Sequence, residues 1–178
     1  PRGAPVLQHR EDLVGGTAVQ GRRELKITII AVGRLGRSTE AGLVRDYAER
    51  ASASGRALGL GPVEVIEVEA RKPGKAAEAE AILAKLDGAH LIACDEHGKA
   101  RASRDFAAMI GRLRDDGVRS LALVIGGADG LDPELLATAK DKLAFGPQTW
   151  PHALARVMLA EQIYRAVTIL AGGPYHRD

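Results

Sequence analysis

From residue 25 onward the chain alternates between short apolar runs and segments in which apolar positions recur with a helical period. Apolar runs of about four to eight residues predict strands, and helical periodicity or an alanine- and glutamate-rich composition predicts helices. The predicted strands are 25–32, 63–68, 90–94, 121–125 and 143–145. The predicted helices are about 38–56, 75–86, 103–114, 133–142 and 152–170.

This order of elements predicts the fold class. Strands that alternate with helices at this spacing indicate an α/β protein with a mostly parallel sheet and helices on both faces. Residues 63–68 alternate with glutamates, as in a strand near a sheet edge, whereas residues 121–125, Leu-Ala-Leu-Val-Ile, are uniformly apolar and predict a buried central strand. Residues 25–178 therefore form a single predicted domain.

Residues 1–24 differ from the rest, because prolines and glycines interrupt any period and the apolar pair Leu13-Val14 is too short for a signal peptide. We interpret this segment as a disordered N-terminal extension. Its four arginines either contact nucleic acid or belong to a solvated tail with three balancing acids. The solvated tail is the favoured interpretation.

The amino-acid composition excludes several kinds of protein. A length of 178 residues with 46% hydrophobic content suits one domain, and a formal net charge of +2 permits a nucleic-acid partner without requiring one. Cys94 is the only cysteine, which excludes an internal disulfide and fits a reducing, cytoplasmic compartment. No apolar run reaches the ~20 residues of a membrane span, and no histidine pair has metal-ligand spacing, so neither a membrane nor a metal is expected.

The apolar run 121–125 leads directly into the glycine-rich turn 126–130, Gly-Gly-Ala-Asp-Gly. Asp132 is a suitable cap for the helix that follows, and Pro133 suits its first position. Turns between a strand end and a helix start bind small molecules in open α/β sheets, because glycine lets a ligand approach the backbone. The turn matches neither the dinucleotide pattern G-x-G-x-x-G nor a phosphate-binding loop.

The last predicted helix, 152–170, is apolar around most of its circumference and must be covered on more than one face. We predict that a second subunit provides part of this cover in a symmetric homodimer. Its apolar positions are Leu154, Val157, Met158, Leu159, Ile163, Val167, Ile169 and Leu170. Glu161 and Arg165 are spaced for an ion pair.

Several segments together resemble one family. These are residues 123–131 (Leu-Val-Ile-Gly-Gly-Ala-Asp-Gly-Leu), residues 150–166 beginning Trp-Pro-His-Ala-Leu-Ala-Arg-Val, and the tail 174–177 (Pro-Tyr-His-Arg). Residues 25–33 and the Asp95-x-x-Gly98-Lys99 loop match too. The chain from 25 to 178 is similar to the RlmH methyltransferases of the SPOUT superfamily. The resemblance implies a small homodimer with a C-terminal trefoil knot that binds S-adenosylmethionine and methylates N3 of a pseudouridine in helix 69 of 23S rRNA, on the assembled ribosome.

The resemblance also implies site residues. The implied cofactor contacts are Cys94, Gly126, Phe145, Gly146, Pro147, Gln148, Thr149 and Trp150. A pocket of backbone groups with apolar walls suits an apolar adenine and a cationic sulfonium. This chain departs from the family pattern at Ala128-Asp129, where members carry Pro-Glu, and at Cys94, where members carry an aliphatic residue.

Methyl transfer to a ring nitrogen requires an oriented acceptor and the loss of one proton. The candidate catalytic residues are His152, Arg156, His176 and Arg177. A helix-start role is an equally good interpretation of His152, whereas the match to the family tail favours function for His176 and Arg177. Two alternatives remain open: a non-catalytic ribosome-binding or assembly factor with the same fold, and an α/β enzyme that binds another nucleotide at the same turn.

Overall fold

Five parallel strands form one sheet in the order β2-β1-β4-β3-β5. The computed structural model describes residues 24–175, so the predicted extension up to residue 23 and the tail residues His176 and Arg177 lie outside it. The strands are β1 (Leu25–Val32), β2 (Leu60–Val68), β3 (His90–Ala100), β4 (Ser120–Ile125) and β5 (Asp141–Ala144). The helices are α1 (Thr39–Gly55), the 3-10 turn η1 (Arg56–Leu58), α2 (Lys75–Leu86), α3 (Ser103–Asp115), α4 (Pro133–Thr138) and α5 (His152–Leu170).

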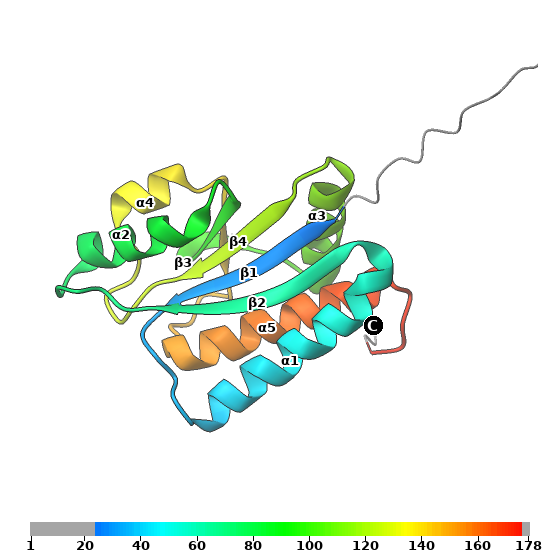
Figure 1. Ribbon diagram of the computed structural model, residues 1–178, viewed down its shortest axis with the longest axis horizontal. Coiled ribbons are helices and arrows are strands. Elements are labelled where there is room, and N and C mark those ends of the chain that lie inside the picture. The colour runs from blue at the N-terminus through cyan, green and yellow to red at the C-terminus, as the bar shows by residue number, and fades with distance from the viewer. Residues whose placement is uncertain (1–23, 176–178) are drawn as a thin grey trace, which may run out of the picture.

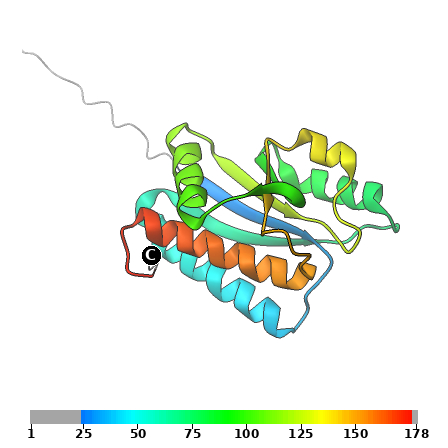
Figure 2. The same ribbon diagram turned by 180° about the vertical axis from the view of Figure 1, so that it is seen from behind.

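Helices cover both faces of the sheet, as predicted. Helices α1, α3 and α5 lie on one face and α2 and α4 on the other (Figures 1 and 2). The side chains of β1 alternate between two apolar clusters, since Ile27 and Ile29 pack with α1, α3 and α5 while Ile30 and Val32 pack with α2 and α4. The predicted α/β class, the edge position of β2 and the central position of β4 are therefore confirmed.

Strand β3 is longer than the predicted strand 90–94. Cys94 and Lys99 both pair with Leu143 of β5, so residues 95–98 form an excursion between two paired stretches. Gly98 lies so close to the backbone of β5 that a Cβ at this position would be 2.7 Å from the Lys142 carbonyl carbon. The polar residues after Cys94 predicted a loop. Pairing with β5, which is distant in sequence, instead extends β3 to Ala100.

Helix α4 is shorter than the predicted helix 133–142, and that end of the prediction is wrong. The helix ends at Thr138, the Lys140 amide donates to the Leu91 carbonyl at 2.9 Å, and β5 begins at Asp141. The Asp141 carboxylate also pairs with Arg101. Pairing with β3 therefore draws residues 140–144 into the sheet.

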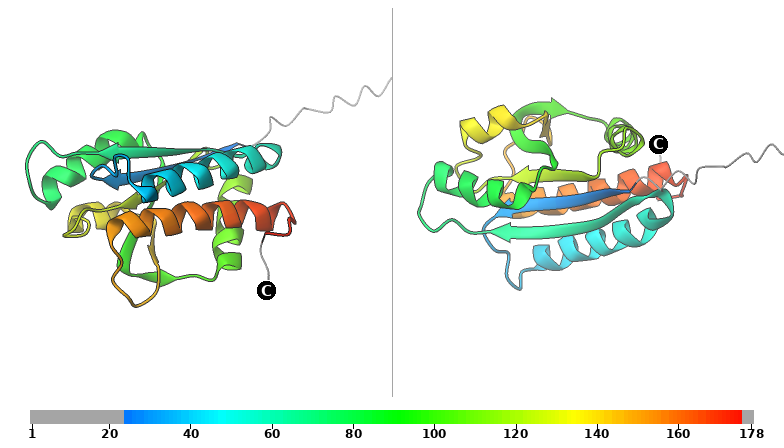
Figure 3. Two further views of the ribbon diagram at one scale, coloured as in Figure 1. Left: turned by 90° about the horizontal axis from the view of Figure 1, so that it is seen from below. Right: turned by 45° about the horizontal axis from the view of Figure 1, so that its top comes forward.

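Helix α5 packs along α1 and α3 on one side of the sheet (Figure 3). Leu159, Ile163 and Val167 are each fully buried within this single chain. The prediction that a second subunit is needed to cover these positions is therefore wrong for them. Leu154 remains 41% exposed, and Val157 and Met158 are partly exposed. The predicted homodimer stays a prediction that concerns this N-terminal half of the helix.

Two further observations concern residues 24–175. No helix in this range combines the length and the hydropathy of a membrane span. Within the same residues, no three His, Cys, Asp or Glu side chains gather in a way that would hold a metal ion.

Candidate functional site

A pocket of about 500 Å³ opens at the carboxyl ends of β4 and β5, beside the point in β3 where the first paired stretch ends at Cys94. Its walls come from the excursion after Cys94, the glycine turn after β4 and the segment 145–152 that joins β5 to α5. Parallel strands end at one edge of a sheet, so turns that are distant in sequence meet there. Seven of the eight residues implied as cofactor contacts line the pocket, namely Cys94, Gly126, Phe145, Gly146, Gln148, Thr149 and Trp150, and Pro147 does not.

Gly126 is required by the turn itself. A Cβ at this position would lie 2.8 Å from the carbonyl carbon of Gly130 and 2.9 Å from its oxygen. Gly127 and Gly130 form an isolated bridge that closes the turn, and Gly130 has a φ of +79°. The lack of a side chain at Gly126 thus lets two backbone segments of the turn approach each other. The sequence had suggested a different reason for the glycine, namely room for a ligand beside the backbone.

The helix that follows the turn is capped as predicted. The Asp132 carboxylate accepts the Glu134 amide at 2.8 Å and the Leu135 amide at 3.4 Å. Leu135 and Leu131 are buried against the sheet. The cap and these two leucines fix the start of α4 directly after the turn.

The segment between β5 and α5 forms a second, self-closed wall. Gly146 has a φ of +96°, and no atom lies within 4 Å of the position that a Cβ would occupy. The indole Nε1 of Trp150 donates to the Phe145 carbonyl at 3.3 Å, which ties the two ends of the loop together. Trp150 itself is 38% exposed. The chain then enters α5 at His152, which also lines the pocket.

The third wall is the start of the β3 excursion. The Asp95 carboxylate accepts the backbone amide of His97 at 2.9 Å and lies 3.4 Å from its imidazole Nδ1. The Cys94 residue is only partly buried, but its thiol is desolvated, and this raises the pKa of the thiol to about 12. Cys94 is thus a neutral, apolar wall at physiological pH.

Sequence reasoning missed several charged groups of the pocket. Asp95, Glu96 and Asp129 bring carboxylates to its lining, and Lys75 from the first turn of α2 adds a cation. The position of Asp95 directly after an apolar strand was the available signal, because strand ends meet at one edge in a parallel sheet. No local signal exists for Lys75, which reaches the pocket from another layer of the fold.

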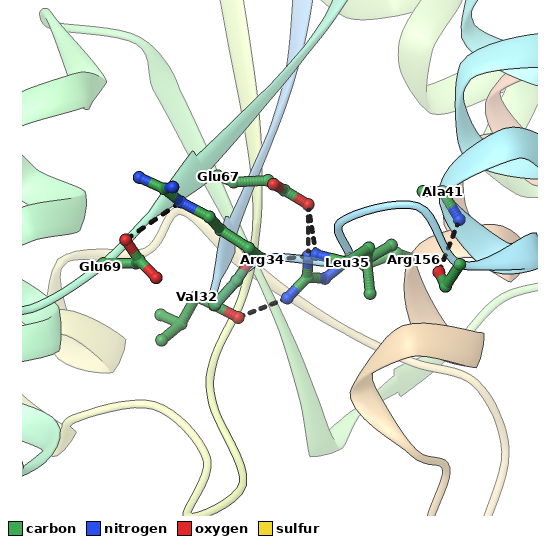
Figure 4. Close-up of polar contacts among 9 residues, drawn as sticks. Val32, Arg34, Leu35, Ala41, Glu67, Glu69 and Arg156 are labelled. Atoms are coloured by element: carbon green, nitrogen blue, oxygen red, sulfur yellow. Dashed lines mark hydrogen bonds and ion pairs between the residues drawn. The ribbon is translucent and has the colours of Figure 1, made fainter.

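Arg156, a predicted catalytic residue, lies away from the pocket lining. Its side chain is fully buried and donates to the backbone carbonyls of Val32 and Gly33, with the Gly33 bond at 3.0 Å (Figure 4). Its Nη1 lies 3.2 Å from Oε1 of Glu67. Burial lowers the pKa of the guanidinium, and Glu67 opposes part of that effect. The structure thus joins Arg156 to the end of β1 and to β2 instead of placing it beside His152 in the pocket.

His176 and Arg177, the other predicted catalytic residues, lie outside the described residues. The residue before them, Tyr175, contacts α5 of its own chain. Its hydroxyl donates to the Glu161 carboxylate at 3.1 Å, and the predicted ion pair between Glu161 and Arg165 is present at 2.6 Å. The described end of the chain is therefore attached to the helix whose first turn borders the pocket.

The chain is similar to known proteins in sequence and in fold. A family model described as "Predicted SPOUT methyltransferase" matches residues 25–176. A protein of Caulobacter sp. (strain K31) named "Ribosomal RNA large subunit methyltransferase H" is 71% identical over 154 residues, 86% of this chain and 100% of that protein. A protein of the same name from Phenylobacterium zucineum (strain HLK1) is 72% identical over 154 residues, with the same shares covered. The crystal structure of a probable methyltransferase from Bordetella pertussis Tohama I shares the fold, with a TM-score of 0.50 and 18% identity over 80% of this chain and 96% of that one.

Proposed function

The chain belongs to the SPOUT methyltransferase family and is a ribosomal RNA methyltransferase, and we propose that it transfers a methyl group from S-adenosylmethionine to N3 of a pseudouridine in helix 69 of 23S rRNA, on the assembled ribosome. The observation that carries the proposal is that the glycine turn 126–130 and the start of the segment 150–166, both of which carry the family resemblance, line one pocket. The cytoplasm is the compartment in which that substrate is assembled.

The residues of the pocket fit the proposed cofactor. Gly130 and Gly146 are both in the left-handed region with no atom within 4 Å of a would-be Cβ, so each leaves room beside its backbone. Ile125, Leu143 and Phe145 provide apolar walls for an adenine ring. The carboxylates of Asp95, Glu96 and Asp129 attract the positive charge of a sulfonium. The residues that would hold the cofactor are the seven implied contacts that line the pocket, namely Cys94, Gly126, Phe145, Gly146, Gln148, Thr149 and Trp150.

When bound, S-adenosylmethionine supplies an electrophilic methyl group. The chain then has to orient the acceptor nitrogen and accept its proton. The His152 imidazole lines the pocket and can accept a proton, and His176 and Arg177 belong to the proposed acceptor site through the tail. The rings of Trp150 and Phe145 line one side of the pocket, where the Trp150 indole is held by its hydrogen bond to the Phe145 carbonyl.

We further propose that the chain acts as a homodimer and contains a C-terminal trefoil knot. The exposed Leu154 and the partly exposed Val157 support the dimer, because they form an apolar surface at the first turns of α5. The knot is proposed from the family whose model matches residues 25–176.

The test is methyl incorporation from radiolabelled S-adenosylmethionine into ribosomes whose 23S rRNA lacks the modification, followed by mapping of the methylated nucleotide. We expect one methyl group per ribosome, at a pseudouridine of helix 69. Binding of ribosomes without incorporation would favour the non-catalytic assembly factor. A thermal shift with NAD or ATP, and none with S-adenosylmethionine, would favour the alternative nucleotide enzyme.

A further inference from the structure

We propose that Arg156 is a positioning residue that fixes the first turns of α5, and through them His152 and Ala155 in the pocket, without touching the substrate. The role presupposes the methyl transfer proposed above. It replaces the catalytic role that the sequence suggested for Arg156.

The start of α5 has no local anchor. Its N-cap is Pro151, no side chain caps it, and its first turn contains no acidic residue. The preceding segment is the pocket loop, whose one side-chain hydrogen bond among the described residues joins Trp150 to Phe145 within the loop. A helix end without a cap frays unless tertiary contacts hold it.

Arg156 provides such a contact one turn into the helix. Its guanidinium donates to the carbonyls of Val32 and Gly33 at the end of β1. It also pairs with Glu67 of β2, whose Oε1 accepts the Leu35 amide at 2.9 Å as well (Figure 4). The single carboxylate oxygen of Glu67 therefore joins α5 to the loop after β1.

The energetics argue that this arginine is not present for stability alone. Its side chain is fully buried, and its Nε has no hydrogen-bond partner among residues 24–175. A cation near a helix N-terminus opposes the helix dipole, and well-packed apolar residues often replace buried ion pairs without loss of stability. What an apolar residue would not supply is a directional attachment to two carbonyls and one carboxylate.

The contacts of Arg156 affect the pocket because α5 places Arg156 close to two pocket residues. His152 is four residues before Arg156 and lies on the same side of the helix, and Ala155 is adjacent to it. His152 and Ala155 both line the pocket. A rotation or a small displacement of the first turns would therefore move both residues relative to the glycine turn, and displacements of this kind are costly to catalysis.

The test compares Arg156→Met, which keeps the length and removes the charge, with Arg156→Lys, Glu67→Gln and the control Val167→Ala. Val167 is fully buried near the far end of α5, so its truncation lowers stability without altering the attachment. For Arg156→Met we expect a melting temperature at or above that of Val167→Ala, a turnover number lowered about 10–100-fold and an unchanged KM for ribosomes. Arg156→Lys should recover part of the turnover, and Glu67→Gln should show a smaller loss.

A second readout does not depend on activity. In the cofactor-free protein, the NMR resonances of the His152 ring should shift in Arg156→Met and stay in place in Val167→Ala. Unchanged His152 resonances together with unchanged turnover would overturn the positioning role. A loss of turnover beyond about 10⁴-fold with unmoved His152 resonances and no rescue by lysine would instead show a direct catalytic contact. If the wild type transfers no methyl group at all, the proposed function fails while the NMR comparison still decides the positioning role. If Arg156→Met does not fold, the same comparison is made with Glu67→Gln, where unchanged resonances and turnover count against the proposal.

Discussion

The hydroxyl of Tyr175 donates a hydrogen bond to the Glu161 carboxylate across 3.1 Å. The Tyr175 ring also packs on Tyr164, with 4.6 Å between ring centroids, and the Arg165 guanidinium lies 4.9 Å from its centroid. Glu161 lines a second pocket, of about 410 Å³, which shares Phe145 and Gly146 with the first. Tyr175 is thus attached to a side chain that lines the second pocket.

We predict that deletion of residues 176–178 leaves S-adenosylmethionine binding nearly intact and lowers methyl transfer by orders of magnitude. The reason is that the cofactor walls lie within residues 75–155, whereas the tail carries two side chains that can bind a phosphate or a uridine oxygen. Arg177→Ala alone should raise the barrier by roughly 1.5–3 kcal/mol if it makes one charged hydrogen bond in the transition state.

Calorimetric titration and methyl incorporation on unmethylated ribosomes measure the two effects separately. Tyr175→Phe is the matched variant, because it keeps the ring contacts and removes only the hydrogen bond to Glu161. It should give an intermediate loss of turnover. Full activity of the truncated chain would show that other residues hold the acceptor.

A second prediction concerns the glycine turn. Gly126→Val should abolish cofactor binding and lower stability, because a side chain there would collide with the Gly130 backbone. Gly42→Ala is the control, since Gly42 lies in α1 with no atom within 4 Å of a would-be Cβ. It should raise stability by about 0.5–1 kcal/mol and leave binding unchanged. A Gly126→Val protein that still binds with wild-type heat in a titration would count against the assigned turn geometry.

The fold class was predictable from the sequence because strands alternate with helices along the chain, and because the uniformly apolar run of β4 indicates a strand buried on both faces. The bounds of four elements were not predicted: β2 begins at Leu60 instead of residue 63, β3 extends to Ala100, α4 ends at Thr138, and β5 spans Asp141–Ala144 instead of 143–145. The excursion in β3 and the early end of α4 both depend on pairing between β3 and β5, and that pairing joins Ala93 to Lys142, which are far apart in the chain. Local propensity does not report such a contact.

The site was predictable where local sequence defines it and not where it depends on tertiary contacts. The glycine turn at Gly126 follows an apolar strand directly, so its place at a strand end could be inferred. Arg156 was a catalytic candidate because it lies in the family segment 150–166 and because an arginine can hold a phosphate or a uridine oxygen. Its actual partners, Gly33 and Glu67, lie 123 and 89 residues away, and nothing in the sequence around Arg156 indicates them.

A third prediction follows from the raised pKa of Cys94. An ordinary thiol titrates near 9.0, whereas desolvation raises the pKa of Cys94 to about 12. Between pH 8 and pH 10 the native thiol should therefore react at least about a hundredfold more slowly with iodoacetamide than the thiol of the urea-unfolded chain, since the thiolate is the nucleophile. Cys94 is the only cysteine, so mass spectrometry of the intact chain measures this directly.

The raised pKa of Cys94 also makes the free energy of unfolding depend on pH. Because the folded state holds the Cys94 proton more tightly, the contribution of this thiol to the free energy of unfolding is complete below pH 9 and is lost as the pH rises toward 12. The difference in stability between the wild type and Cys94→Ala should shrink over that range. Equal alkylation rates in the native and unfolded states would contradict the desolvated position of the thiol.

The last prediction separates the proposed dimer from the core of one chain. Val157 is partly exposed and Leu154 is 41% exposed, whereas Ile163 is fully buried within the protomer. Val157→Asp should therefore yield a folded monomer of lowered stability, because Val157 packs only partly against the core of its own chain and its exposed side lies in the proposed interface. Ile163→Asp should unfold the chain, since burial of an unpaired carboxylate costs several kcal/mol.

Sedimentation and far-UV circular dichroism distinguish these outcomes, and Leu83→Asp is the control. Leu83 is 48% exposed on α2, on the opposite face of the sheet from α5, so this change should affect neither association nor folding. The proposed tail function also predicts that the Val157→Asp monomer binds cofactor but transfers methyl poorly if the tail acts across the dimer. Wild-type protein that sediments as a monomer at micromolar concentration would remove the dimer, and an active Val157→Asp monomer would show that the tail acts on the pocket of its own chain.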